Sequence, residues 1–300
     1  MGELQFVIRG FKKLLKSVLP ARASNTISAY RSRNHQIRYV ERMGIPKDNL
    51  AFIRAYGETV MGGPFQGLRY PASELGVRPS VPYLLGIAEK ELHGVLNTAF
   101  SRSYDCVINI GSAEGYYAVG LAWKLRIPAY AFEPEPRERH YCRVLAKRNN
   151  VQHLLTVRSW FSERQMRQFA NRRCLVVCDC EGYETNLFRP GTVDWTRQWD
   201  LIIELHGREA EELLVSRFST SHCVSLIEAE DRHEADYPML HGVVGNPSAA
   251  ISENRPMPSR WLWAESRMEK EGRPGPDSKA SADVLDISSS IAGALNRHHR

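Results

Sequence analysis

The chain has 300 residues, of which 43% are apolar and 25% charged; this ordinary globular composition excludes a fibrous or wholly disordered chain. No apolar run approaches the roughly 18 residues of a membrane span, and basic residues interrupt the apolar start, so the sequence predicts neither a transmembrane segment nor a secretory signal. Six cysteines fit a reducing compartment. We therefore expect a cytoplasmic protein.

The formal net charge of +6 is concentrated near the amino terminus. Residues 1–50 carry ten Lys and Arg against three acidic residues, a net of +7, so the other 250 residues sum to −1. A nucleic-acid enzyme more often carries basic charge over its working face. The distribution therefore favours a partner other than nucleic acid.

Residues 4–19 have apolar side chains at helical spacing with lysines opposite, which predicts one amphipathic helix. Two interpretations stay open, namely packing on this protein or a second subunit, and peripheral contact with a membrane surface. Gly and Pro are frequent in residues 57–80 and predict an irregular loop or a short hairpin, so we set residues 1–80 apart as a basic amino-terminal arm. Residues 271–300 lack aromatic side chains and predict a disordered tail.

Residues 81–270 form the predicted main domain, in which strand and helix patterns alternate. A helical pattern runs from Pro82 to about Ser101. Strands are expected at 105–110, 127–132, 153–158, 174–179, 200–205, 222–228 and 260–265, and helices at about 114–125, 136–149, 162–171 and 208–218. The strands are continuous apolar runs, typical of a sheet covered on both faces. The alternation predicts an α/β fold with a mainly parallel sheet.

The first strand runs into a glycine-containing turn, Asn109-Ile110-Gly111-Ser112-Ala113-Glu114-Gly115, and a helix follows. A dinucleotide site needs G-x-G-x-x-G, which this turn lacks, so a nicotinamide dehydrogenase is disfavoured. Glu133 ends the second strand 22 residues beyond Gly111, where a βαβ unit places an acid against ribose hydroxyls. The pair predicts a nucleoside-cofactor site, although a tight turn and an exposed strand-end acid would give the same pattern.

Acidic residues follow the fourth strand in the segment Cys178-Asp179-Cys180-Glu181-Gly182-Tyr183-Glu184, and the fifth strand ends in Glu204-Leu205-His206. The carboxyl ends of parallel strands meet at one edge of the sheet, where open α/β sheets bind ligands. We therefore expect these acids and the histidine to converge on one mouth.

At these residues the chain resembles the FkbM-type family of S-adenosylmethionine-dependent methyltransferases. The resemblance is carried by VINIGSAEGYYAVGLA, AFEPEPRERHYCRVLAKRN, VVCDCEGYETNLFRPG and LIIELHG. It covers residues 105–207 and extends weakly upstream through FQGLRYP. The sequence departs from the family at Asn109, where the family more often has Asp.

The resemblance implies a class I methyltransferase sheet, Rossmann-like, with seven mostly parallel strands, the last antiparallel, and helices on both faces. S-adenosylmethionine would be the cofactor, with Glu133 on the ribose and Gly111 and Gly115 along the methionine moiety. Asn109 and Ser112 belong to the same predicted cofactor set. Asp179 would lie near the cofactor's methyl group or the acceptor. The implied reaction is O-methylation of a sugar hydroxyl or a related natural product.

A hydroxyl acceptor needs a base to take its proton. His206 is the first candidate because an imidazole is largely neutral at pH 7, and Asp179 is the second. We assign Glu181, Glu184 and Glu204 to acceptor binding. Mg²⁺ held through the oxygens of Asp179, Glu181, Glu184 and Glu204 is an alternative that the sequence does not favour, and no metal site is predicted. The competing function is a catalytically silent S-adenosylmethionine-binding interaction module.

Overall fold

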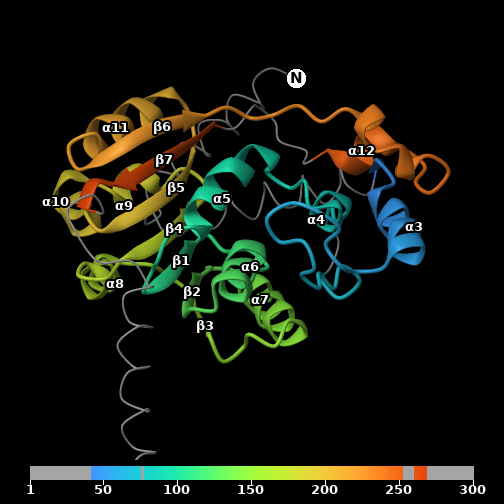
Figure 1. The fold of residues 1–300 in the computed structure, drawn as a ribbon, viewed down its shortest axis with the longest axis horizontal. Coiled ribbons are helices and arrows are strands. Elements are labelled where there is room, and N and C mark those ends of the chain that lie inside the picture. Colours follow the sequence, from blue (N-terminus) through green and yellow to red (C-terminus); the bar gives the residue numbers. More distant parts are fainter. Residues whose placement is uncertain (1–41, 76–77, 253–259, 269–300) are drawn as a thin grey trace, which may run out of the picture.

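The computed structural model describes residues 42–75, 78–252 and 260–268 (Figure 1). The helix predicted over residues 4–19 and the tail predicted over 271–300 lie outside these residues. In the described part of the chain, no helix combines the length and the apolar character that crossing a bilayer requires.

Seven strands form one sheet in the order β3-β2-β1-β4-β5-β7-β6. β7 runs antiparallel to both of its neighbours, and the pairs from β3 to β5 are parallel. This arrangement confirms the predicted class I methyltransferase fold. The strands are β1 Cys106–Ile110, β2 Ala129–Phe132, β3 Leu155–Arg158, β4 Cys174–Cys178, β5 Trp199–Leu205, β6 His222–Ile227 and β7 Arg260–Ser266.

The crossover helices form where the sequence predicts them: α6 Tyr116–Leu125, α7 Pro136–Arg148, α8 Glu163–Phe169 and α11 Arg208–Phe218. The helical pattern expected from Pro82 to about Ser101 is divided instead into α4 Val81–Leu85, the 3-10 turn η1 Lys90–Leu92 and α5 His93–Phe100. The division follows from positive φ angles at Gly86 (76°) and Glu89 (47°), which no right-handed helix can include. The other described elements are α3 Ile45–Tyr56, α9 Glu184–Leu187, α10 Pro190–Val193, η2 Asp194–Thr196, η3 Glu234–Asp236, η4 Pro238–Leu240 and α12 Pro247–Ile251.

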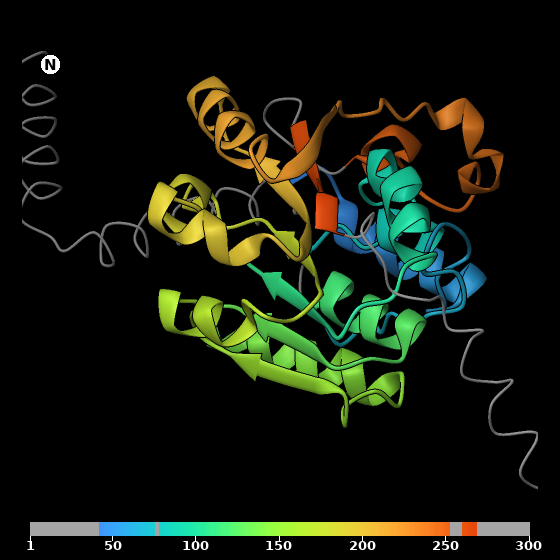
Figure 2. The same ribbon diagram turned by 60° about the vertical axis from the view of Figure 1, so that its left-hand side comes forward.

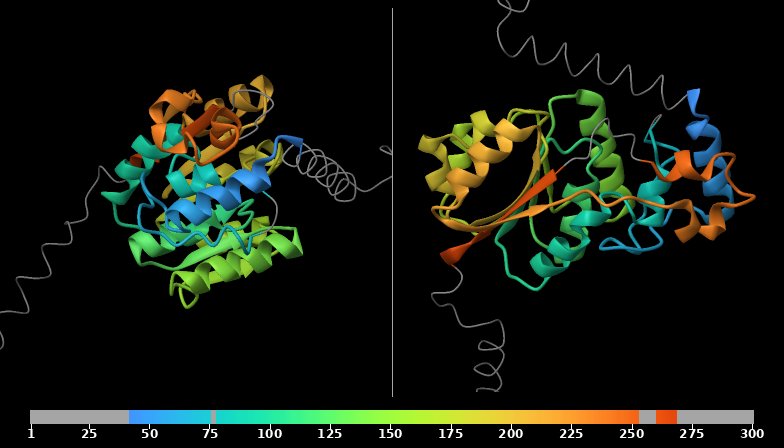
Figure 3. Two further views of the ribbon diagram at one scale, coloured as in Figure 1. Left: turned by 90° about the vertical axis from the view of Figure 1, so that its right-hand side faces the viewer. Right: turned by 90° about the horizontal axis from the view of Figure 1, so that it is seen from above.

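The sheet separates two apolar cores because successive side chains of a strand point to opposite faces. Val107 and Leu175 pack with α5, α6 and α7 on one face. Ile108 and Val176 pack with α8 and α11 on the other. Figure 3 shows the two helix layers from above, with the sheet between them. The predicted covering of both faces is thus present.

The described residues before position 80 belong to the first of these cores. Phe52, Phe65 and Leu75 are buried within it. Phe65 lies over α6, where a Cβ added to Gly120 would come within 2.9 Å of its ring. α3, α4 and α12 lie together at one end of the molecule (Figures 1 and 2). The segment thus contributes to the apolar core on one side of the sheet, while the predicted domain boundaries stay predictions.

Candidate functional site

The turn after β1 packs tightly between two neighbouring parts of the chain. Gly111 and Gly115 have φ angles of 74° and 95°, a region that favours glycine. A Cβ added to Gly111 would overlap the carbonyl oxygen of Asp179, and one added to Gly115 would lie 2.5 Å from Cys142 Sγ. The two glycines therefore allow the loop, residues 111–115, to lie against both the end of β4 and α7.

Glu133 follows β2 and touches this loop. Its Oε2 accepts the backbone N–H of Ala113 at 3.0 Å, and its Oε1 accepts that of Glu135 at 2.8 Å. The side chain is buried, which raises the pKa of Glu133 to about 6, so the carboxylate is mostly ionised at pH 7. Each oxygen keeps a further lone pair. The structure thus joins the two predicted parts of the nucleoside site, with an acceptor for a ligand hydroxyl.

Two buried polar atoms, one just before the loop and one within it, have no hydrogen-bond partner among the described residues. They are Oδ1 of Asn109, whose Nδ2 donates to the Val177 carbonyl at 3.2 Å, and Oγ of Ser112. Both residues are almost fully buried, at 2% and 4% exposure. A buried polar atom without a partner is costly. The two atoms would fit the ammonium and carboxylate groups of a bound amino-acid moiety.

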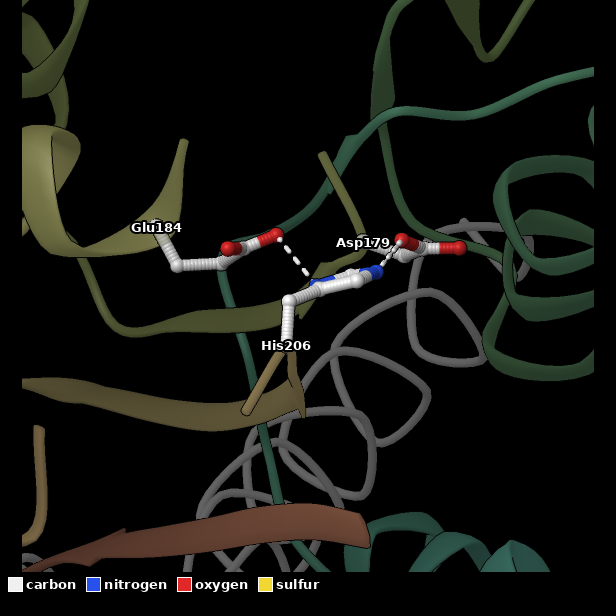
Figure 4. A group of neighbouring side chains, drawn as sticks. All are labelled: Asp179, Glu184 and His206. Carbon is white, nitrogen blue, oxygen red and sulfur yellow. Dashed lines mark ion pairs between the residues drawn. The ribbon is translucent and has the colours of Figure 1, made fainter. Parts of the chain in front are cut away.

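A second group of side chains gathers where β4 and β5 end (Figure 4). His206 Nδ1 lies 3.2 Å from Glu184 Oε1. The other ring nitrogen, Nε2, lies 3.7 Å from Asp179 Oδ1 and 3.7 Å from Glu204 Oε2. Three of the acids and the histidine at the ends of the two strands therefore converge on one place. Glu181 lies in the same turn as Asp179, with an exposed side chain.

Glu184 is fully buried and joins the turn after β4 to His206. Its Oε1 accepts the backbone N–H groups of Cys180 at 2.9 Å and Gly182 at 3.3 Å. Burial by itself raises the pKa of Glu184, but the hydrogen bond and charge of His206, together with backbone N–H groups, outweigh it, and the net shift is downward. Burial likewise lowers the pKa of His206, but Glu184, together with the charges of Glu204 and Glu181, outweighs it and the net shift is upward. A charged carboxylate thus faces Nδ1.

Asp179 differs from Glu184 in its charge state. Burial, followed by the charge of Glu204, raises the pKa of Asp179 well above its usual range. Glu181 and Glu89 act in the same direction. A nearby carboxylate disfavours ionisation of its neighbour, so Asp179 retains a proton more readily than Glu184.

Glu89 is a member of this mouth that sequence reasoning did not find. It lies between α4 and η1 with a φ of 47°, and the Tyr117 hydroxyl bonds to its Oε2. No motif surrounds Glu89. Its bond with Tyr117 and its effect on Asp179 join parts of the chain that are distant in sequence.

Asp179, Glu184 and His206 each offer one potential metal-ligand atom, and these atoms lie within 4.8 Å of one another. Glu184 and Asp179, however, face opposite nitrogens of the ring. One ion binds one nitrogen of an imidazole, so a cation here would replace one of the existing contacts. Mg²⁺, which takes oxygen ligands, fits this donor set less well than a proton-transfer pair does.

No family model matches the sequence, and no curated protein matches it. Solved structures with distant similarity include the human methyltransferase 10 domain containing protein, with 13% identity and a TM-score of 0.37 over 59% of this chain and 80% of that chain. Precorrin-6y C5,15-methyltransferase from Geobacter metallireducens has 12% identity and a TM-score of 0.40, covering 57% and 87%. The C-terminal domain of the Rhodobacter capsulatus enzyme has 12% identity and a TM-score of 0.38, covering 55% and 82%. The fold class rests on the strand order described above.

Proposed function

We propose that the protein is an S-adenosylmethionine-dependent methyltransferase that methylates a hydroxyl of a saccharide or glycosylated metabolite. The observation that carries the proposal is the 3.0 Å hydrogen bond from the Ala113 N–H to Glu133 Oε2. It joins a glycine loop to a strand-end acid at the carboxyl edge of a parallel sheet, where nucleosides bind. The resemblance to the FkbM-type family supplies the acceptor class.

The residues that would hold the cofactor lie on and around the loop. Glu133 accepts the ribose hydroxyls, and the backbone from Gly111 to Gly115 lies along the methionine moiety. The orphaned Asn109 Oδ1 and Ser112 Oγ take the amino-acid end. When bound, the cofactor supplies a methyl group on a positively charged sulfur. The protein's part is to hold the acceptor oxygen in line with that methyl group, which contributes much of the rate.

His206 is the base in this proposal, and Glu184 orients it. The buried Glu184 carboxylate lies 3.2 Å from Nδ1, so it favours the tautomer in which Nδ1 carries the hydrogen. Nε2 is then left to accept the proton of the acceptor hydroxyl. The complete burial of Glu184 suits this positioning role better than direct contact with an acceptor. Asp179 remains the second candidate base, although its raised pKa favours a hydrogen-bonding role.

The charge of the mouth supports a neutral acceptor. Four acidic residues gather there, since Glu204, Glu181 and Glu89 all raise the pKa of Asp179. Such a mouth repels an anionic acceptor such as a phosphorylated sugar, whereas the hydroxyls of a neutral saccharide can donate to these oxygens. Nucleic acid, which is anionic, is unsuited to the same mouth. We also propose a reducing, cytoplasmic setting, in keeping with the six free cysteines.

Calorimetry with S-adenosylmethionine, its demethylated product and NAD tests the cofactor. We expect binding of the first two only, and tight NAD binding without the others would overturn the proposal. Because a hydrogen bond to a charged group contributes about 1.5–3 kcal/mol, Glu133→Ala should weaken cofactor binding about tenfold to a hundredfold or more. Glu133→Gln should weaken it less.

A silent cofactor-binding module is the second candidate, favoured by Asn109 at a position where the family more often has Asp. Turnover of labelled cofactor with a panel of saccharides separates the two. Transfer of label to any neutral saccharide supports the enzyme. Tight cofactor binding without transfer to any member of the panel supports the module.

A further inference from the structure

The side chain of Glu114 is a member of the glycine loop that the cofactor proposal does not use. Glu114 is buried, at 4% exposure, and its carboxylate is held from outside the loop. Oε1 accepts the Tyr70 hydroxyl at 3.0 Å, and Oε2 pairs with the Arg78 guanidinium. Both partners come from the segment that precedes α4, so residues far from the loop in sequence hold the Glu114 side chain in place.

Arg78 connects Glu114 to α7 as well. Its Nη2 donates to Glu138 Oε2 at 2.8 Å, and its Nε donates to the Leu75 carbonyl at 2.9 Å. The guanidinium also lies over the Tyr141 ring, 5.3 Å from the ring centroid. One planar group thus joins the loop, the first turn of α7 and its own segment. A lysine, which carries a single ammonium centre, cannot reproduce that geometry.

Tyr70 is held in place both through its ring and through the backbone of the preceding residue. Its ring is fully buried and stacks on Tyr83, with centroids 5.2 Å apart and planes within 5° of parallel. The backbone of the preceding residue, Arg69, exchanges two 2.8 Å hydrogen bonds with the side chain of Asn149, just after α7. The segment FQGLRYP, residues 65–71, is therefore in contact with Asn149, the last residue of the motif AFEPEPRERHYCRVLAKRN.

The conformation of the loop depends on such support. Ala113, which precedes Glu114, has a φ of 44° although it is not glycine, and its N–H makes the contact with Glu133. A strained backbone persists only where its surroundings hold it in place. The anchors of Glu114 act on the residue next to the strained one, so they bear directly on the position of the Ala113 N–H.

We propose that Arg78 and Tyr70 are positioning residues for the cofactor loop: through Glu114 they hold Ala113 where its N–H meets Glu133. The identity of the ligand rests on the proposed function, but the effect on the loop does not. The segment before α4 is accordingly part of the machinery that binds the cofactor, with both residues acting through Glu114.

The first test compares Arg78→Lys and Tyr70→Phe with a matched control, Arg102→Lys. Arg102 also bridges two carboxylates, Asp200 and Glu265, and its side chain is 15% exposed against 17% for Arg78. Arg102 lies at the edge of the sheet opposite the candidate site, where β5 begins. Calorimetry with the demethylated cofactor should show affinity reduced about tenfold or more in Arg78→Lys and a few-fold in Tyr70→Phe. Arg102→Lys should lower the melting temperature without changing affinity.

A double-mutant cycle sharpens this comparison. Because Arg78 is proposed to act through Glu114, combining Arg78→Lys with Glu114→Gln should weaken binding little more than the worse single change. Full additivity of the two effects would contradict the proposed route.

The second test needs no ligand. Hydrogen exchange of the free protein should show lost protection in residues 111–116 for Arg78→Lys and Tyr70→Phe, but not for Arg102→Lys. If wild type binds neither the cofactor nor its product, the proposed function fails, and exchange still decides the positioning role. Unchanged exchange and affinity in both loop variants would overturn the inference, as would equal effects in Arg102→Lys. Tyr70→Phe, which removes one oxygen, keeps the test valid if Arg78→Lys does not fold.

Discussion

His206 lies between carboxylates of two kinds. Glu184, fully buried beside Nδ1, has a lowered pKa and is charged, whereas Asp179, 3.7 Å from Nε2, has a raised pKa. Two carboxyl groups a few ångströms apart therefore differ in charge state, and the difference comes from their surroundings alone. The ring gains a fixed side, which faces Glu184, and a reactive side, which faces the mouth.

If His206 takes the acceptor proton, His206→Ala should lower kcat about 10²–10⁴-fold, the usual contribution of a positioned base. Cofactor affinity should hardly change, because a base acts on the acceptor. Steady-state kinetics and calorimetry on the same preparation measure the two. Normal turnover in His206→Ala would transfer the role to Asp179 or to a metal-bound hydroxide, and loss of activity on chelation with recovery in Mg²⁺ would select the metal.

The pH dependence of the rate should report the contact with Glu184. An imidazole must be neutral to take a proton, so kcat/KM should fall as pH drops through the apparent pKa of His206, which Glu184, with Glu204 and Glu181, raises above its usual value. Glu184→Gln removes the charge that raises this pKa, so the acidic limb should move to lower pH. Glu181→Gln, an exposed control, should move it far less. Identical acidic limbs in wild type and Glu184→Gln would show that the limb belongs to another group.

At the scale of elements, α7 is fixed at both ends to the segment that precedes α4. Its first turn carries Glu138, which bonds to Arg78. Its end is followed by Asn149, whose amide bonds to both backbone groups of Arg69 and to the Leu145 carbonyl at 2.9 Å. Asn149 thus closes the helix and serves as a one-residue hydrogen-bonding partner for an irregular segment.

Asn149→Ala should therefore lower the free energy of unfolding by about 2–4 kcal/mol, because it leaves two partly buried backbone groups without partners. Urea denaturation measures the change. Arg148→Ala is the matched control, since Arg148 pairs with Glu74 of the same segment through side chains that are 54% and 40% exposed. A surface pair contributes about 1 kcal/mol or less. Equal losses in the two variants would refute the distinction.

The strands and their chemistry were predictable because each depends on a local pattern. Buried parallel strands are apolar runs, and Glu133, Asp179 and His206 directly follow or end such runs. The turn at Glu89 was not predictable, because the leucines around it are spaced as in one helix, and the positive φ accompanies a contact with distant Tyr117. The roles of Tyr70 and Arg78 were not predictable for the same reason, since long-range packing brings their segment to the loop.

At the scale of the whole molecule, the basic charge and the candidate site occupy different parts of the sequence. The described hydrogen bonds and ion pairs of Glu114 and Glu133 come from residues at or after Tyr70. The excess of Lys and Arg lies in residues 1–50. A function for the amino-terminal residues can therefore be tested separately from the site.

Deleting residues 1–20 should leave cofactor affinity nearly unchanged, as calorimetry can check. If residues 4–19 contact membranes, the full-length protein should sediment with anionic vesicles at low salt, and the deletion should abolish sedimentation. A full-length protein that never sediments would favour packing on this protein or on a second subunit. A large loss of cofactor affinity on deletion would contradict the separation.

The close approach of Gly111 to the Asp179 carbonyl links two events that a reaction scheme treats as separate. The loop that would hold the methyl donor and the turn that begins the acceptor mouth are in backbone contact, and the Asp179 N–H donates to the Ile110 carbonyl at 2.9 Å. Neither can shift without displacing the other. Occupancy of one subsite should thus change affinity at the other, and by thermodynamic linkage the second ligand must alter the first by the same factor.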